Sequence, residues 1–504
     1  MSKIGKERES VQQVFIDYSK EVNWEYLQRD EVRSLRTLEG EYLTEFLLYD
    51  IFSERVIKLN KPFMTKSLVQ TLIKQMKGIR PTIEGNLNSW EYLKGLKTVY
   101  VPELKREKNV KLIDFENPDK NLYHITDEFT FKSRSEGIRG DIVLFINGIP
   151  VLIVETKSST KLNGVQEAFD QITRYHHQAP EFLSVLQIYV LPDIIHFFYS
   201  PTWNLSPKFI LNWKTGKDES YKDLVKSFIN PHMLLDIISD YILFTRQDDI
   251  LKKVILRPHQ ISAVRKIEDR AKDEEKKRGL IWHTQGSGKT YSMIVSAKKI
   301  LEKQEFKNPT VIMLVDRNEL ETQLFSNLES VGIKNVKVTK SKKNLLKLLK
   351  EDKRGIIVSL IHKFEGMKEK INTRDNIFVF VDEAHRTTGG HLGNYLMGAL
   401  PNAKYIGFTG TPIDKSQYGK GTFKTFGIDD IPEGYLDKYS ISESIKDNTT
   451  VPLHYSLAPN KLLVDKEVLE KEFFSLSEIY GITDIEELNR ILQKAVTLRN
   501  MLKN

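Results

Sequence analysis

The sequence contains no cysteine, so the 504-residue chain can form neither a disulfide nor a thiolate metal site. Any bound metal must be held by carboxylates, carbonyl groups or imidazole, and such ligands favour a hard ion such as Mg²⁺. Long apolar runs are also missing, since no stretch approaches the roughly 20 apolar residues of a membrane-spanning helix. The start, MSKIGKERES, is charged where a signal peptide needs an apolar segment. These absences predict a soluble, cytoplasmic protein without a membrane partner.

Length and composition indicate the number of domains and the kinds of partner that the chain could bind. The chain exceeds what one hydrophobic core usually organises, so two or three domains are expected. Its 76 Lys and Arg residues outnumber 68 Asp and Glu residues, which gives a net charge of +8. This balance suits a polyanion such as nucleic acid, but an ordinary basic protein surface would give it too. Composition alone leaves both interpretations open.

Hydrophobic spacing divides the chain into two α/β parts and a tail. Residues 10–95 carry apolar side chains at the three- and four-residue spacing of helices. From about residue 110, the segments 123–133, 140–157 and 184–200 are typical of strands, with a helix between them. Five continuously apolar segments then alternate with helices, as in a parallel sheet covered on both faces. These expected strands lie within 278–284, 309–316, 355–361, 377–385 and 403–411. We expect α/β domains over 1–240 and 241–435, then a linker and helical tail over 436–504.

A glycine-rich segment between an apolar strand and a helix has the context of a phosphate-binding loop. Its two glycines allow backbone amides to close around phosphates at the positive end of the next helix. In such a loop Lys289 would reach the β and γ phosphates of ATP, and Thr290 would hold Mg²⁺. His283 stands where the general motif has glycine. The residues expected to bind this cofactor are Thr284, Gln285, Gly286, Ser287, Gly288, Lys289 and Thr290.

The apolar segment IFVFV at 377–381, an expected strand, is followed directly by two carboxylates. Asp382 is expected to bind Mg²⁺ through water, and Glu383 to polarise the attacking water as a general base. A strand that ends in Asp-Glu can instead simply open a turn. Together with the glycine-rich loop, however, the pair favours an ATP site.

These segments and their order resemble the first RecA-like lobe of superfamily-two helicases and translocases. The resemblance implies that Arg257 and Gln260 belong to an adenine-reading segment, with the Gln260 amide on the edge of the base. It implies that residues 316–320 (DRNEL) and 359–363 (SLIHK) contact the DNA backbone. Residues 409–412 (TGTP) match the motif that links the state of ATP to the grip on DNA.

In the first part of the chain, Asp141 is followed by Glu155 and Lys157, the Asp…Glu-x-Lys pattern of the PD-(D/E)xK nucleases. In that chemistry two carboxylates hold Mg²⁺, the ion lowers the pKa of bound water, and the lysine orients or deprotonates that water. Glu155 and Lys157 lie two residues apart on a strand and therefore face the same side. We expect a catalytic site with Mg²⁺ on Asp141 and Glu155. A polar-edged hairpin without function is the alternative.

Whether Asp141 joins this site depends on the hairpin between the two strands. A two-residue turn at 147–148 would place Asp141 opposite Val154, on the wrong face. A three-residue loop, or a bulge, would place it opposite Glu155. We predict the second arrangement.

Gln171 and Tyr175 lie four residues apart on an expected helix and share one face. Such a Gln-x-x-x-Tyr element beside the nuclease motif resembles the restriction subunits of type I restriction-modification enzymes. The resemblance implies that both residues belong to the catalytic site. It also implies a glutamate on an N-terminal helix, for which Glu7 and Glu9 are the candidates.

The resemblance to the type I restriction subunits extends to about residue 460. It implies Mg²⁺-dependent cleavage of double-stranded DNA coupled to ATP-driven translocation, in complex with modification (methyltransferase) and specificity subunits. The family continues with a second RecA-like lobe and a helical domain, which do not fit into residues 461–504. The sequence therefore predicts a C-terminally truncated subunit with impaired turnover. The alternatives are an ATP- and DNA-binding module or remnant without catalysis, and a solitary nuclease with an ATP switch.

Overall fold

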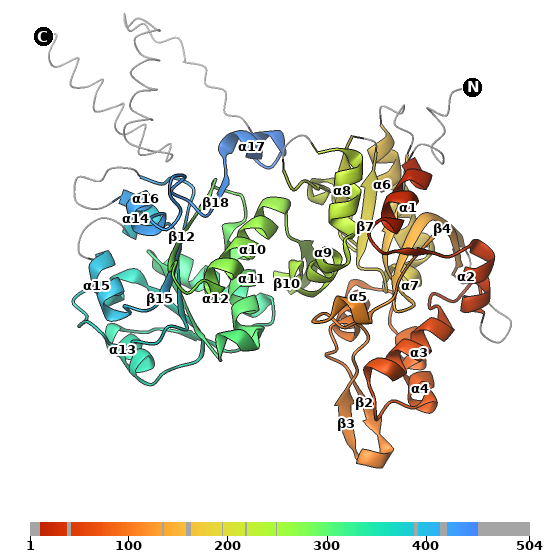
Figure 1. Ribbon diagram of the computed structural model, residues 1–504, viewed down its shortest axis with the longest axis horizontal. Helices are drawn as coiled ribbons and strands as arrows, with labels where there is room; N and C mark the ends of the chain where they lie inside the picture. Colours follow the sequence, from red (N-terminus) through yellow and green to blue (C-terminus); the bar gives the residue numbers. More distant parts are fainter. Residues whose placement is uncertain are drawn as a thin grey trace, which may run out of the picture. The chain divides into compact units, whose positions relative to one another are not determined.

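The computed structural model describes residues 11–37, 42–133, 136–157, 163–193, 195–216, 219–247, 249–387, 392–413 and 421–451. The chain forms two compact units, residues 1–258 and 259–504 (Figure 1). Among the described residues, no helix has the length and apolar character needed to span a lipid bilayer. Both units mix helices with a sheet, as the sequence pattern predicts.

The first unit begins with helices and a small hairpin. Its helices carry apolar residues on one face only: in α4, for example, Leu68, Val69, Leu72, Ile73 and Met76 are buried. The helices before the main sheet are α1 (Gln13–Lys20), α2 (Arg29–Arg36), α3 (Tyr49–Leu59), α4 (Lys66–Lys77) and α5 (Ile83–Leu93). The hairpin pairs β2 (Thr98–Val101) with β3 (Arg106–Asn109).

A seven-stranded mixed sheet forms the core of this unit, in the order β1-β4-β5-β6-β7-β8-β9. Strands β5 and β6 lie in its middle, and all described residues of β6 are buried. Only the pairs β1–β4 and β6–β7 are parallel. The strands are β1 (Glu25–Tyr26), β4 (Tyr123–Lys132), β5 (Gly137–Ile146), β6 (Ile149–Val154), β7 (Ile188–Pro192), β8 (Phe197–Pro201) and β9 (Leu211–Asn212).

Helices α6 (Gly164–Gln178) and α7 (Pro180–Leu183) connect β6 to the parallel strand β7. Helices α8 (Tyr221–Ile229) and α9 (Pro231–Asp236) follow the sheet. The strands expected within 123–133, 140–157 and 184–200 are confirmed.

The first unit ends about eighteen residues later than the expected boundary at 240, at Pro258. A hairpin of β10 (Ile242–Gln247) and β11 (Ile250–Ile255) extends it. The side chain of Lys253 on β11 is buried and donates to Asn86, Gln187 and Thr202 of this unit. These contacts fix β11 to the first unit, so the expected boundary at 240 is corrected to 258.

The second unit has a seven-stranded sheet in the order β14-β15-β13-β16-β17-β12-β18, with all pairs parallel. The five strands that the apolar runs predict are present. The structure adds β14 and β18, two short edge strands. The strands are β12 (Arg278–His283), β13 (Thr310–Val315), β14 (Val336–Val338), β15 (Gly355–Leu360), β16 (Ile377–Val381), β17 (Lys404–Thr409) and β18 (Asp437–Tyr439).

Helices cover both faces of this sheet, as expected for parallel strands. Alternate residues of β13 show why: Val311 and Met313 face one core and Ile312 and Leu314 the other. The first core takes α10 (Pro258–Lys272), α11 (Lys289–Glu302) and α12 (Asn318–Ser330). The second takes α13 (Lys342–Lys350), α15 (Leu392–Ala399) and α16 (Gly421–Phe426). Two short helices, α14 (Ala384–Thr387) and α17 (Ile441–Lys446), complete the described part.

Strand β18 also changes the expected end of the second domain. It pairs with β12 in parallel, so residues 437–439 belong to the sheet and not to a linker that begins at 436. The expected helical tail lies outside the described residues, and α17 lies in the expected linker. The boundary at 435 is therefore corrected to a point beyond β18.

Candidate functional site

The hairpin of β5 and β6 has a two-residue turn and one bulge. Ile146 pairs with Ile149 across the turn, and the register shifts by one residue between Leu144 and Phe145, where Val151 is extra. Asn147 and Gly148 have φ values of 52° and 79°, as a type I′ turn requires. Beyond the bulge Ile142 pairs with Val154, and the same register continued by one residue places Asp141 opposite Glu155.

The turn itself is buried and held from outside the hairpin. The Asn147 amide donates to the Leu112 carbonyl and to Asn121, and its oxygen accepts the Leu122 amide. A Cβ on Gly148 would lie 2.7 Å from the Leu48 carbonyl oxygen, so the turn admits only glycine there. The turn is therefore fixed by packing, and the bulge restores the face of Asp141.

Asp141 is anchored by the residue between Glu155 and Lys157. The Thr156 amide and hydroxyl both donate to Asp141 Oδ2, each at 2.8 Å. The backbone carbonyl of Asp141 accepts a hydrogen bond of 2.7 Å from Gln12 Nε2. These contacts hold the strand and one carboxylate oxygen in place.

Glu155 lies at the centre of this cluster and is fully buried. Burial, followed by the charge of Asp141, raises its pKa well above the ordinary value, and Lys157 opposes that shift. Lys157 Nζ lies 3.4 Å from Glu155 Oε1. The structure thus brings the three residues of the expected nuclease motif together.

Gln171 and Tyr175 also reach this cluster from α6. Gln171 Nε2 donates to the Tyr175 hydroxyl at 2.7 Å, and that hydroxyl donates to the Arg139 carbonyl at 2.5 Å. Burial, followed by the charge of Glu155, raises the pKa of Tyr175. Tyr175 therefore links α6 to β5 and lies within electrostatic reach of the buried carboxylate. Glu7 and Glu9 lie outside the described residues.

The donor set fits a divalent cation. Two carboxylates lie together, and Glu155 Oε2 is buried without a hydrogen-bond partner. Within the described part of the chain, no three His, Asp or Glu side chains gather as a complete metal cage. Mg²⁺ suits such a site because it keeps several waters and takes only one or two protein carboxylates.

The phosphate-binding loop follows β12 in the second unit. Gly286 and Gly288 have φ values of 75° and 82°, which only glycine adopts at no cost. Lys289 begins α11, and its Nζ donates to the carbonyls of His283 and Thr284 at 3.2 and 3.4 Å. The ammonium is thus folded over the loop, where a phosphate would compete for it.

Asp382 and Glu383 follow β16 and act on the same lysine. Burial lowers the pKa of Lys289, and the charges of Glu383 and Asp382 oppose that shift. Burial and then Glu383 raise the pKa of Asp382 to about 6. The expected loop lysine and the expected carboxylate pair therefore lie within electrostatic reach of each other. Thr290 is the second residue of α11, beside this lysine.

The strand between them, β17, contributes a third segment. Thr409 Oγ1 lies 2.9 Å from His385 Nδ1, and His385 Nδ1 lies 3.4 Å from Glu383 Oε2. A Cβ on Gly410 would lie 3.1 Å from the Gln285 amide nitrogen. Residues 409–410 are thus in contact with both the carboxylate segment and the phosphate loop.

Helix α10 supports the loop from the other side. Gln260 Nε2 donates to the Gly288 carbonyl at 2.9 Å, and His259 Nε2 lies 2.9 Å from the Ser287 carbonyl oxygen. The expected role of Gln260 on adenine stays a prediction. Arg257 lies in the first unit, just before the boundary.

The segments expected to touch DNA make contacts within the chain. Asp316 Oδ2 lies 3.3 Å from Arg386 Nη1, next to the carboxylate pair. Lys363 Nζ lies 3.1 Å from Glu321 Oε1, and Ser359 is fully buried. In segment 359–363 only His362 is exposed, whereas Arg317, Asn318 and Glu319 of segment 316–320 are exposed. Contact with the DNA backbone stays a prediction.

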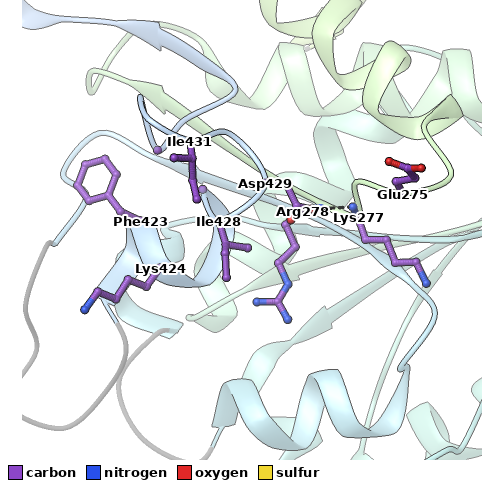
Figure 2. A pocket seen from close by; sticks show the side chains of 10 residues that line it. Glu275, Lys277, Arg278, Phe423, Lys424, Ile428, Asp429 and Ile431 are labelled. Carbon is purple, nitrogen blue, oxygen red and sulfur yellow. Dashed lines mark hydrogen bonds between the residues drawn. The ribbon is translucent and has the colours of Figure 1, made fainter.

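A pocket of about 700 Å³ lies at the other end of β12 (Figure 2). Arg278, Lys277 and Phe423 line it, and the Asp429 carboxylate accepts the backbone amides of 277 and 278 at 2.8 Å each. Because β12 begins at Arg278 and the phosphate loop follows its last residue, this pocket is separate from the nucleotide site.

Sequence reasoning missed several residues that shape the two sites. Gln12 and Thr156 hold Asp141, and Asp437 lies 2.7 Å from His283. Thr156 could have been found because it stands between two motif residues. Asp437 gave no local signal, since its partner is far away in the sequence.

Fold and geometry define a nuclease-type α/β domain followed by a P-loop ATPase lobe. Residues 5–204 match the family model for the N terminus of the type I restriction enzyme R protein, and residues 259–484 match that for the SWI2/SNF2 ATPase. The chain thus carries the N-terminal domain of type I restriction R proteins followed by a SWI2/SNF2 ATPase domain, which confirms the resemblance drawn from its motifs.

Curated relatives agree with this assignment. The endonuclease subunit of the type I restriction enzyme HindI from Haemophilus influenzae is 29% identical over 96% of this chain and 49% of its own length. A subunit from Methanocaldococcus jannaschii, provisionally named as the endonuclease of the type I enzyme MjaIXP, is 30% identical over 87% of this chain and 45% of its own length. The chain therefore spans about half the length of these relatives.

Among solved structures, a nuclease-deletion mutant of the Type ISP restriction-modification enzyme LlaGI in complex with a DNA substrate mimic matches 38% of this chain and 18% of its own. The sequence identity is 20% and the TM-score is 0.29. A likeness of this size indicates nothing about what the chain binds.

Proposed function

We propose that this chain is the nuclease and first motor lobe of a type I restriction subunit. It would cleave double-stranded DNA with Mg²⁺, bind ATP, and act with modification and specificity subunits. One observation carries the nuclease part: the bulge at Val151 brings Asp141 opposite Glu155, beside Lys157. A hairpin without function would not need to turn two carboxylates onto one face against their mutual repulsion.

The residues of the first unit divide the work of phosphodiester hydrolysis. Asp141 and Glu155 would hold Mg²⁺, which supplies charge for the transition state and lowers the pKa of attacking water. Lys157 would orient that water or accept its proton. Thr156 and Gln12 keep Asp141 in place, and the Tyr175 hydroxyl, which donates to the Arg139 carbonyl, holds α6 against β5.

The second unit supplies a nucleotide site. Lys289 would bind the β and γ phosphates, Thr290 and Asp382 would hold Mg²⁺, and Glu383 would polarise water. The resemblance places ATP between two lobes, with an arginine on the second. We therefore propose that the 504-residue chain alone binds MgATP but turns it over roughly a thousandfold or more slowly than a two-lobed motor.

Nicking of supercoiled DNA tests the nuclease. The purified chain would be incubated with Mg²⁺, with and without ATP, and with and without type I modification and specificity subunits. We expect cleavage that needs Mg²⁺ and is abolished by Asp141→Ala. The control Asp170→Ala removes an exposed carboxylate from α6, which carries Tyr175, and should cleave normally. Intact DNA in every mixture would contradict the nuclease.

A binding module without catalysis is the second candidate. Ion pairs around the motor motifs favour a chain that does not drive translocation, since Lys363 and Asp316 are engaged within the chain. It predicts DNA binding and MgATP binding without cleavage. Cleavage by the chain alone, independent of modification and specificity subunits, would instead indicate a solitary nuclease.

A further inference from the structure

A buried imidazole underlies the phosphate-binding loop. His283 is the last residue of β12 and is fully buried. It stands at the position where the general loop motif begins with glycine, which has no side chain to place there. Its Nε2 lies 2.7 Å from Asp437 Oδ2 on the neighbouring strand β18. The loop therefore starts from a side chain that is tied to another strand.

Asp437 also binds helix α10. Its second oxygen, Oδ1, accepts from the Ser262 hydroxyl at 2.9 Å and from Lys266 Nζ at 2.6 Å. Burial opposes the charge on Asp437, but the hydrogen bonds from His283 and Lys266 outweigh it, so its pKa lies below the ordinary value. One ionised carboxylate thus joins the end of β12, strand β18 and helix α10.

The same two elements, α10 and β18, hold the loop backbone directly. From α10, His259 and Gln260 reach the carbonyls of Ser287 and Gly288 at 2.9 Å each. From β18, the Tyr439 carbonyl accepts the amide of the first loop residue, at position 284, at 3.0 Å.

A ring contact connects these two supports. The rings of Tyr439 and His259 are stacked, with centroids 3.7 Å apart and planes within 10°. The loop is therefore held at three backbone points by two elements, and Asp437 is the carboxylate that fastens these elements to each other and to β12.

We propose that Asp437 is a positioning residue of the nucleotide site: through His283 and α10 it holds the phosphate-binding loop in the shape that accepts a triphosphate. It touches no nucleotide itself. The proposal rests on the proposed ATP site and explains why this chain has histidine at the glycine position. A loop that is already ordered pays less conformational entropy when it binds.

The test compares binding of MgATP and of magnesium tripolyphosphate, which probes the loop without the base. Asp437→Asn keeps the shape but removes the charge, and His283→Leu removes the donor to Asp437. We expect each variant to bind both probes about tenfold more weakly. His283→Gln retains an N–H donor and should recover most of the affinity.

Asp430→Asn is the matched control. Asp430 forms the ion pair with Arg270 at the far end of α10, at 2.5 Å and with both side chains largely buried. Like Asp437, Asp430 binds a side chain of α10, but it is not connected to the phosphate-binding loop through His283. We expect Asp430→Asn to lower the unfolding temperature about as much as Asp437→Asn does, while binding both probes as the unmodified chain does.

Two results would overturn the proposal. One is MgATP and tripolyphosphate affinity within twofold of the unmodified chain for both Asp437→Asn and His283→Leu. The other is an equal loss in Asp430→Asn, which would assign the effect to fold stability. If the unmodified chain does not bind MgATP, the proposed nucleotide site is itself wrong, and the role of Asp437 falls with it.

Discussion

Thr156 donates its backbone amide and its hydroxyl to the same oxygen of Asp141, each over 2.8 Å. Two donors on Oδ2 fix the carboxylate plane and leave Oδ1 for another partner. Thr156 is itself fully buried and lies between the two other residues of the nuclease motif. The geometry of Asp141 therefore depends on the Thr156 amide and on its hydroxyl.

Replacing Thr156 tests this dependence. Thr156→Val removes the hydroxyl at constant shape, and a lost hydrogen bond to a charged group costs about 1.5–3 kcal/mol. We expect Mg²⁺-dependent DNA cleavage to fall about tenfold to a hundredfold, with Thr156→Ser close to the unmodified chain. The measurement is the initial rate of plasmid nicking at saturating Mg²⁺. Equal rates for the valine and serine variants would show that the amide alone positions Asp141.

Metal binding at the nuclease site should release protons. Burial and the charge of Asp141 raise the pKa of Glu155, so the carboxyl retains a proton above its ordinary range when no cation is present. A cation favours the ionised form, so Mg²⁺ affinity should increase with pH until Glu155 is ionised without the metal. Calorimetry of Mg²⁺ binding in two buffers with different ionisation enthalpies measures the released proton.

Glu155→Gln serves as the reference for this titration. The amide cannot ionise, so the proton release should vanish together with most of the affinity. Asp170→Asn, an exposed change on α6, should leave both unchanged. A proton count that stays zero in the unmodified chain at every pH above 4.5 would contradict the raised pKa.

Much of this site could be predicted from residue spacing, and the hairpin shows where prediction stopped. The pattern of Asp141, Glu155 and Lys157 predicted a Mg²⁺-dependent nuclease site. Because the two carboxylates must share one face of the sheet, it also predicted the strand register that places Asp141 opposite Glu155. It did not give the position of the bulge at Val151. That position depends on a turn held by Leu112 and Asn121, which are distant in sequence.

The second unit shows the same limit. Continuous apolar runs predicted five of its strands, because strands buried on both faces need apolar side chains throughout. Strand β18 has the sequence DKY, and only two of its three residues are buried, so it gave no such signal. The pairing of Asp437 with His283 spans 154 positions and depends on the completed sheet. The boundary at Pro258 depends likewise on the tertiary contacts of Lys253.

Nucleotide binding should depend on pH through Asp382. Its pKa is raised to about 6 by burial and by Glu383, so the carboxyl loses its charge as the pH falls through that value. Because Mg²⁺ needs the ionised form, the affinity for MgATP should fall about tenfold for each pH unit below 6. Fluorescence titration with a labelled nucleotide between pH 5 and 8 measures this.

The nucleotide titrates over the same range, and Asp382→Asn separates the two effects. The ligand behaves identically with both proteins, so the ratio of their affinities reports Asp382 alone. We expect the ratio to approach one at pH 5 and to increase through pH 6. A ratio that stays constant with pH would show that Asp382 does not ionise in this range.

Replacing the buried Lys253 should destabilise the first unit far more than replacing its exposed neighbour Lys252. Its ammonium is buried among neutral oxygens, with Asn86 Oδ1 at 2.6 Å, Gln187 Oε1 at 2.8 Å and Thr202 Oγ1 at 3.1 Å. Lys253→Met keeps the length of the side chain but leaves these oxygens without their donor. We expect the free energy of unfolding to fall by about 3 kcal/mol. Urea unfolding followed by tryptophan fluorescence measures the change.

A variant of the neighbouring lysine and the pH dependence of stability show whether the buried ammonium causes this loss. Lys252 is the preceding residue of β11 and is exposed, so Lys252→Met should change stability by less than about 0.5 kcal/mol. Burial lowers the pKa of Lys253 well below its ordinary 10.5. Between that lowered pKa and 10.5 the unfolded chain binds more protons than the folded one, so this residue makes stability increase with pH. In Lys253→Met the free energy of unfolding should not show that increase with pH. If the same slope persists in the variant, other groups cause it, and the loss of stability comes only from the lost hydrogen bonds.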